Sequence, residues 1–138
     1  MLFTKNKEEL FVYHYSIIGG KAKLLRKVYD FEKGCDYDLF LDFIENSIGV
    51  TDLDKDNLGE ITFAYQKACI SDVSPKGLKL LILENGNKYI IRGTNSIDKP
   101  GIKVDGSKKV DASFDEAPAG FLSLANKIWD KVDRIVLK

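Results

Sequence analysis

Groups able to carry out nucleophilic or metal chemistry are scarce in this chain, which has one histidine, His14, and two cysteines, Cys35 and Cys69. A thiol beside an imidazole can act as a nucleophile with its base, but nothing in the spacing of these residues favours that pair. His14 lies inside an apolar segment, where a hydrogen-bonded core imidazole is the commoner role. Structural zinc sites use more Cys and His ligands than the chain has. The sequence therefore predicts no catalytic residue, no metal site and no cofactor, and so a protein that is not an enzyme.

A second candidate is the acidic segment 54–65, DKDNLGEITFAY, which resembles the start of an EF-hand calcium loop. Counted from Asp54, acids stand at the first and third positions and Gly59 at the sixth. Calcium needs oxygen ligands at the fifth and twelfth positions as well, and these residues are Leu58 and Tyr65. Because tyrosine cannot supply the bidentate carboxylate that completes the cage, we expect no calcium here and interpret the segment as an acidic surface turn.

A third candidate is the triplet Gly19-Gly20-Lys21, which lies between an apolar run and a segment with helical spacing. A helix that began here would offer free amides to an anion. The phosphate-loop pattern, however, requires a longer glycine frame and a Ser or Thr after the lysine, where this chain has Ala22. We interpret the triplet as a tight turn.

Acidic residues are concentrated in one part of the chain, although the whole protein is neutral, with 21 basic and 21 acidic residues. Between residues 30 and 60, ten acidic residues stand against two basic ones. A negative field of this kind speeds the approach of a basic partner and sets specificity. The alternative is that lysine-rich segments fold alongside and cancel the charge. The residues expected to bind the partner are Asp36, Asp38, Asp42, Glu45, Asp52, Asp54 and Asp56.

Composition argues against several other partners. The net charge is zero and the basic residues are 18 Lys against 3 Arg, so we expect no nucleic acid partner, because arginine is the usual reader of bases and phosphates. No stretch approaches the roughly 20 apolar residues of a membrane helix, and charges interrupt the start of the chain where a signal peptide needs an apolar core. We therefore expect no membrane partner, a cytoplasmic location and reduced cysteines.

These observations favour a small non-catalytic cytosolic interaction protein. Its expected task is to bind and neutralise a basic protein partner through the acidic face, as an immunity protein or antitoxin neutralises a toxin or nuclease. The alternative is a small-molecule-binding domain or small enzyme with a pocket between sheet and helices. Convergent polar groups at inward positions would favour that alternative, and His14 is the main one that the sequence offers. The oligomeric state stays open.

The first half of the chain predicts one strand followed by two helices. Residues 10–18 are dense in aromatic and β-branched side chains and predict a buried strand, with a helix capped by Asn6 as the alternative. Apolar residues at helical spacing predict helices over about 21–33 and 36–48, each followed or interrupted by glycine.

The second half contains the clearest local signal, Asn85-Gly86 between two apolar runs, which predicts a hairpin over 78–92 with a type I′ turn. A second hairpin is expected over 102–114, turning near 105–106. Residues 61–70 fit a strand or a helix equally well.

The C-terminal region predicts one more helix, over about 116–133, with Trp129 on its apolar face as a core residue. The sum is an α+β fold in a single domain, 1–138, with an antiparallel sheet of four to six strands and helices packed on one face.

Overall fold

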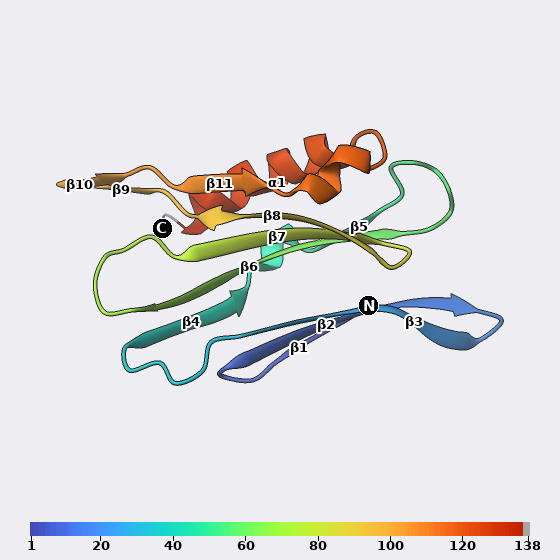
Figure 1. Ribbon diagram of the computed structural model, residues 1–138, viewed down its shortest axis with the longest axis horizontal. Helices are drawn as coiled ribbons and strands as arrows, with labels where there is room; N and C mark the ends of the chain where they lie inside the picture. The colour runs from blue at the N-terminus through green and yellow to red at the C-terminus, as the bar shows by residue number, and fades with distance from the viewer. Residues whose placement is uncertain (137–138) are drawn as a thin grey trace.

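Two antiparallel sheets and one helix form three layers in the computed structural model, which describes residues 1–136 (Figure 1). The larger sheet is the middle layer. The helix α1 (Phe121–Val136) covers one of its faces, and a three-stranded sheet covers the other. The expected α+β class therefore holds in broad terms, with more strand and less helix than the sequence predicted.

Every strand pair in the described residues is antiparallel. The small sheet contains β1 (Leu2–Lys5), β2 (Glu9–Ile18) and β3 (Lys21–Phe31), in that order. The large sheet has the order β11-β8-β7-β6-β4, with β5 also paired to β6. Its strands are β4 (Asp38–Phe43), β5 (Gly49–Thr51), β6 (Glu60–Ile70), β7 (Gly77–Glu84), β8 (Asn87–Thr94) and β11 (Ser107–Val110). A separate ribbon contains β9 (Ile97–Lys99) and β10 (Ile102–Val104).

The large sheet has an apolar core on each of its faces, which explains why its central strands are apolar almost without a break. On the helix side, Leu80 and Ile82 of β7 pack with Phe121, Ala125 and Trp129. On the other side, the alternate β7 residues pack against the small sheet; this core includes Leu10, Val12, Val28, Phe63, Leu81, Leu83 and Ile90. Trp129 is 4% exposed, so its predicted place in the core is confirmed.

Two predicted elements are confirmed, and a segment that the sequence left open between strand and helix is a strand. Residues 10–18 belong to β2, and the ambiguous segment 61–70 is a strand within β6. The hairpin over 78–92 is formed by β7 and β8, and both turn residues, Asn85 and Gly86, have positive φ angles (46° and 86°), as a type I′ turn requires.

The helix predicted over 21–33 is wrong, because these residues form β3. Leu24 and Arg26 pair with consecutive residues of β2, so Leu25 between them is an extra residue, a β-bulge. The bulge shifts the alternation of the two faces by one residue. The outward face also carries apolar side chains, such as the half-exposed Tyr29, and the two effects together imitate helical spacing.

The helix predicted over 36–48 is also wrong. Its residues form β4 and a single 3-10 turn over Glu45–Ser47. Apolar side chains of this segment serve both cores, since Leu41 packs on the side of the small sheet and Ile44 on the side of α1. Apolar residues on both sides remove the alternation by which a strand is recognised.

The hairpin predicted over 102–114 is wrong in its pairing. β10 pairs with β9, whereas β11 returns to the large sheet and pairs with β8. Gly93 and Gly106 permit this return, because a Cβ on either would collide with the facing backbone. The helix predicted over 116–133 is confirmed as α1, although it begins only at Phe121; Glu116 ends a 3-10 turn, Ala112–Glu116, and residues 117–120 connect the two.

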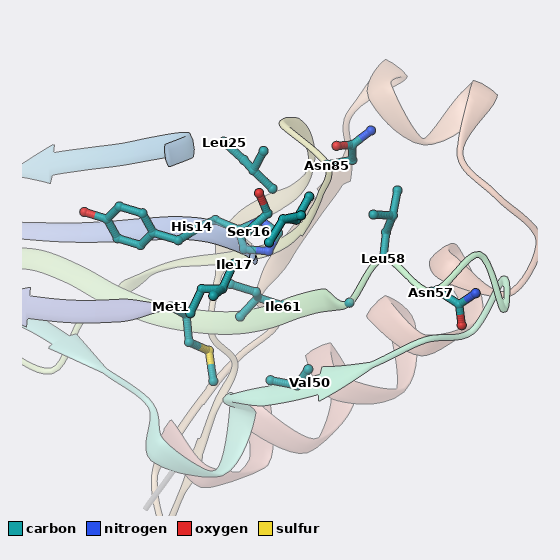
Figure 2. Close-up of a pocket in the computed structure, with 13 residues that line it drawn as sticks. Met1, His14, Ser16, Ile17, Leu25, Val50, Asn57, Leu58, Ile61 and Asn85 are labelled. Atoms are coloured by element: carbon teal, nitrogen blue, oxygen red, sulfur yellow. The ribbon is translucent and has the colours of Figure 1, made fainter. Parts of the chain in front are cut away.

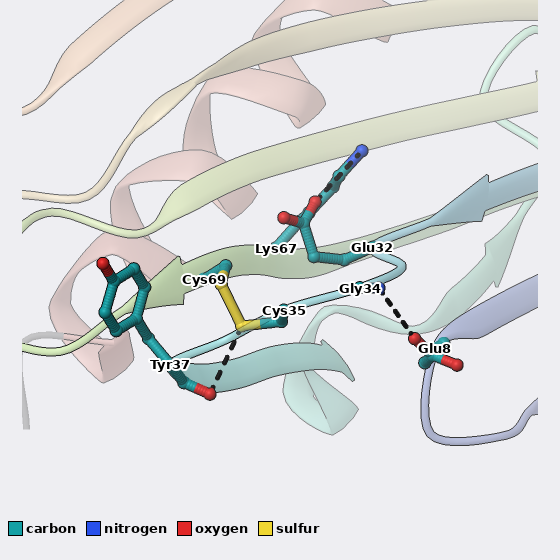
Figure 3. The surroundings of a disulfide bond; sticks show 7 residues. All are labelled: Glu8, Glu32, Gly34, Cys35, Tyr37, Lys67 and Cys69. Atoms are coloured by element: carbon teal, nitrogen blue, oxygen red, sulfur yellow. Dashed lines mark hydrogen bonds and ion pairs between the residues drawn. A yellow bond between two sulfur atoms is a disulfide. The ribbon is translucent and has the colours of Figure 1, made fainter.

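A disulfide joins Cys35 to Cys69, with Cα atoms 5.7 Å apart, and this corrects the expectation of reduced thiols (Figure 3). Cys35 precedes β4, and Cys69 lies near the end of β6, the strand that pairs with β4. The bond therefore ties the edge strand β4 to its neighbour. Within residues 1–136, no helix is long and apolar enough to cross a membrane.

Candidate metal centre

Five carboxylates gather at one end of the large sheet, around the loop 52–59. Figure 1 shows this loop where it joins β5 to β6. Carboxylate oxygens of Asp52, Asp54 and Glu60 lie within 4.8 Å of one another. The same is true of Asp54, Asp56 and Glu84, so Asp54 belongs to both groups. We call these five residues, Asp52, Asp54, Asp56, Glu60 and Glu84, the carboxylate cluster.

The loop backbone holds two of the three loop acids, Asp52 and Asp56, in place. The amide of Asn57 donates a hydrogen bond of 3.1 Å to Asp52 Oδ2, and the amide of Leu58 donates one of 2.8 Å to Asp56 Oδ1. Asn57 has a φ of 65°, a left-handed conformation that asparagine tolerates better than most residues. The chain thus bends so that alternate carboxylates turn toward one side.

Two glutamates of the cluster come from the sheet and are buried beneath the loop. Glu60, at the start of β6, is fully buried, and its oxygens accept hydrogen bonds from the Leu53 amide (2.8 Å) and the Thr51 hydroxyl (3.3 Å). Glu84 ends β7 and is 6% exposed. Because Ile61 pairs with Leu83, the two glutamates stand at the same end of adjacent strands.

The cluster lacks the cationic partners that normally accompany buried carboxylates. Within residues 1–136, Glu84 Oε2 and Asp54 Oδ1 are buried without a hydrogen-bond partner. Burial, and then the facing carboxylates of Asp54, Asp56 and Glu60, raise the pKa of Glu84 to about 7. Buried charges are otherwise paired, coordinate metals or take up a proton, so a cation, or a proton shared by Glu84 and Asp54, would relieve this arrangement.

A second buried carboxylate, Asp30, shows how the chain pairs such a group elsewhere. Its oxygens accept hydrogen bonds from Tyr65 (2.6 Å), Lys67 (2.9 Å) and Lys79 (2.7 Å). Burial alone would raise the pKa of Asp30, but the bonds from Lys79, Tyr65 and Lys67 outweigh it and hold that pKa well below its ordinary value. The carboxylate cluster has no comparable set of lysines among the ion pairs of the described residues.

The structure also shows that the acidic segment compares better with an EF-hand loop when its positions are counted from Asp52 than from Asp54. Counted from Asp52, acids occupy positions one, three and five, the left-handed Asn57 takes the sixth position, and Glu60 is ninth, whereas the twelfth position is Phe63, which offers no carboxylate. The sixth position is where an EF-hand loop needs glycine for its sharp turn. Counting from Asp54 hid the first acid. No frame of this loop includes Glu84, because that residue comes from another strand, β7.

The other acids expected to form the partner-binding face lie elsewhere. Asp38 pairs with Ile70, and Glu60 stands at the opposite end of β6. A rise of ~3.3 Å per residue puts Asp38 roughly 30 Å from Glu60. Asp42 is exposed and pairs with Lys5 at 3.6 Å. The exposed Asp36 precedes β4, and Glu45 lies in the 3-10 turn after it. The structure therefore brings Asp52, Asp54 and Asp56 together and does not join the remaining four to them.

The remaining candidates have simple places in the fold. Gly19 and Gly20 form the tight turn between β2 and β3, each with a positive φ (59° and 76°), and no helix begins there. His14 is buried as expected, but within residues 1–136 its Nδ1 has no hydrogen-bond partner. No protein-family model, curated protein or solved structure matches the chain.

Proposed function

We propose that this chain is a small non-catalytic binding domain that holds one calcium ion in the carboxylate cluster. The observation that carries the proposal is Glu84, a buried carboxylate that faces Asp54 and whose Oε2 lacks a hydrogen-bond partner among residues 1–136. A divalent cation at this point would replace repulsion between carboxylates with attraction. The proposal keeps the non-catalytic class expected from the sequence. It replaces the expectation of no metal site and no calcium, and it gives part of the acidic segment a different ligand.

Calcium fits the donors better than other common metals do. The cluster offers only oxygen, from the five carboxylates, and the Leu58 carbonyl stands at the seventh position, which is a backbone ligand in EF-hand loops. Calcium takes about six to eight oxygen ligands in flexible geometry, whereas magnesium retains several waters. Zinc and copper favour the nitrogen and sulfur ligands that are absent from this cluster.

The disulfide supports a setting in which calcium is abundant. Disulfides persist in oxidising compartments, where thiols are not kept reduced. Calcium modules that work outside the cytosol commonly bind with dissociation constants of about 0.1–1 mM. We therefore propose an oxidising compartment in place of the cytoplasmic location expected from the sequence.

Binding of a basic protein partner, the function expected from the acidic segment, has weaker support and stays a prediction. Three of its seven residues belong to the carboxylate cluster, and Asp42 is paired with Lys5. The exposed Asp36, Asp38 and Glu45 are what remains available to such a partner.

Terbium luminescence tests the proposed site and its position together. Terbium replaces calcium in oxygen sites and emits when a nearby tyrosine is excited. Tyr89 is such a tyrosine: its pKa is raised by burial and then by the negative charges of Glu84 and Asp54. We expect terbium emission that excess calcium abolishes. The variant Tyr89→Phe should lose most of the emission and keep its calcium affinity.

Glu84→Gln provides a sharper test because its effect should change sign with calcium. Without calcium, the variant should unfold at a higher temperature than the native chain, because one of the facing carboxylates has lost its charge. With calcium at 100 times its dissociation constant, binding stabilises the native chain by about 2.7 kcal/mol, and the order should reverse. Asp38→Asn, outside the cluster, is the matched control. Equal responses of both variants to calcium would contradict the proposal.

A further inference from the structure

A pocket of about 400 Å³ lies directly beside the loop of the carboxylate cluster (Figure 2). Its walls come from the ends of β2 and β3, the turn at Asn85, strand β5 and the loop 52–59. Figure 2 shows Leu25 on one side of the space, Val50 on the opposite side and Leu58 reaching in from the loop. Pockets that bind small molecules are typically this size or larger, with mostly apolar walls and few polar groups.

The wall of this pocket contains a buried polar group without a partner. His14 is 6% exposed, and within residues 1–136 its Nδ1 makes no hydrogen bond. Burial, and then the charge of the N-terminal ammonium, lower the pKa of His14, which keeps the imidazole neutral at neutral pH. A neutral imidazole nitrogen either donates or accepts, depending on the tautomer, and a hydroxyl group can satisfy it in both cases.

The other residues of the wall favour a ligand that is apolar apart from its hydroxyl group. Leu25, Val50, Leu58 and Ile61 supply apolar walls. The position of one wall is fixed independently of any ligand. Arg26, beside Leu25, donates a 2.8 Å hydrogen bond from Nε to the Gly86 carbonyl and so ties β3 to the β7–β8 turn.

Three residues of the metal loop, Asn57, Leu58 and Gly59, also line the pocket. The side chains of Asn57 and Leu58 line the pocket, while their amides donate to Asp52 Oδ2 and Asp56 Oδ1. A cation that fixes these two carboxylates therefore also fixes the wall of the pocket. By linkage, a cation that strengthens ligand binding at that wall is itself bound more tightly, by the same factor, when the ligand is present.

We infer that this pocket binds a small, mostly apolar alcohol or phenol whose hydroxyl group bonds to His14, and that calcium strengthens the binding. The second part of this inference rests on the proposed calcium site, whereas the first part does not.

The probe pair 1-naphthol and naphthalene tests the inference, because the two share an apolar body and differ in one hydroxyl group. Titration of each probe can be followed by the amide NMR signals of the pocket residues. We expect 1-naphthol to shift the signals of Ser16, Asn57 and Leu58 and to bind about fivefold more tightly than naphthalene, the value of one hydrogen bond. His14→Leu should remove that difference.

Two leucines of the loop provide a matched pair in case His14→Leu folds poorly. Leu58 and Leu53 are 38% and 41% exposed, but only Leu58 is among the residues that line the pocket. Leu58→Ala should weaken the binding of both probes several-fold, and Leu53→Ala should leave it unchanged. Calcium should strengthen 1-naphthol binding to the native chain by about fivefold.

The outcomes separate the two proposals. Binding of 1-naphthol that depends on His14 and Leu58 supports the pocket even if calcium itself does not bind, a result that would refute only the calcium site. Calcium binding with no 1-naphthol binding, or with equal effects of the two leucine variants, overturns the pocket. Unchanged 1-naphthol affinity in a chain that does bind calcium overturns the coupling.

Discussion

Removal of the Cys35–Cys69 disulfide should lower the free energy of unfolding by about 4 kcal/mol. The two cysteines are 34 residues apart in sequence, so the bond closes a long loop in the unfolded chain. The loop-entropy relation gives roughly 2.1 + 1.5R ln 34 ≈ 13 cal/mol/K, which is about 3.8 kcal/mol at 25 °C. At this chain length the loss corresponds to a melting temperature lower by roughly 10–15 °C.

The assay is urea denaturation of the native chain and of the double variant Cys35→Ser/Cys69→Ser. The unfolded variant is more expanded, so its denaturant dependence should be steeper while its midpoint falls. Native protein that has been unfolded and reduced should refold to the stability of the variant. A thiol assay that finds two free cysteines in the native chain, or a loss below about 1 kcal/mol, would refute the reasoning.

Three other substitutions test the packing. Asp30→Asn should cost about 3 kcal/mol, because Lys67 and Lys79 lose a buried counter-charge. Since the folded pKa of Asp30 lies below its unfolded value, the gap between native and variant should shrink as the pH falls below about 3.9, as urea melts at several pH values would reveal. Trp129→Ala should cost about 3–5 kcal/mol and leave a poorly soluble protein; a near-native midpoint would move Trp129 out of the core. Asp42→Lys removes an exposed ion pair with Lys5 and a long, exposed hydrogen bond from Gln66, so calorimetry should find a change below about 1 kcal/mol.

The elements that could be predicted from the sequence are those whose signal is local. Asn85 and Gly86 both tolerate the positive φ angles of a type I′ turn, so these two residues are enough to predict the hairpin between β7 and β8. The helix α1 packs on the sheet through one apolar face, so the four-residue spacing of Phe121, Ala125 and Trp129 is sufficient to predict a helix. Neither inference needs knowledge of a distant strand.

The missed elements depend on contacts between distant segments. β3 contains a bulge at Leu25 that only its pairing with β2 reveals. The segment 36–48 contributes to two cores, through Leu41 of β4 and Ile44 after it, which a helix on the surface of a sheet would not do. The two cysteines come together because β4 pairs with β6, and the positions of the cysteines in the sequence do not predict that pairing.

The candidate metal centre was hidden for the same reason. Asp52, Asp54 and Asp56 are visible as an alternating acidic run, and a frame that begins at Asp52 would have included all three. The decisive group, Glu84, reaches the cluster because β7 pairs with β6. Its burial without a partner is a property of the folded chain alone.

Calorimetric titration of the intact, metal-free chain with calcium chloride is the most direct test of the proposed function. A calcium site formed by the carboxylate cluster predicts one ion per chain, with a dissociation constant at or below about 1 mM. The same titration of Glu84→Gln should yield markedly weaker binding, and Asp38→Asn should match the native chain. No measurable heat at millimolar calcium, or binding that Glu84→Gln leaves unchanged, would contradict the site.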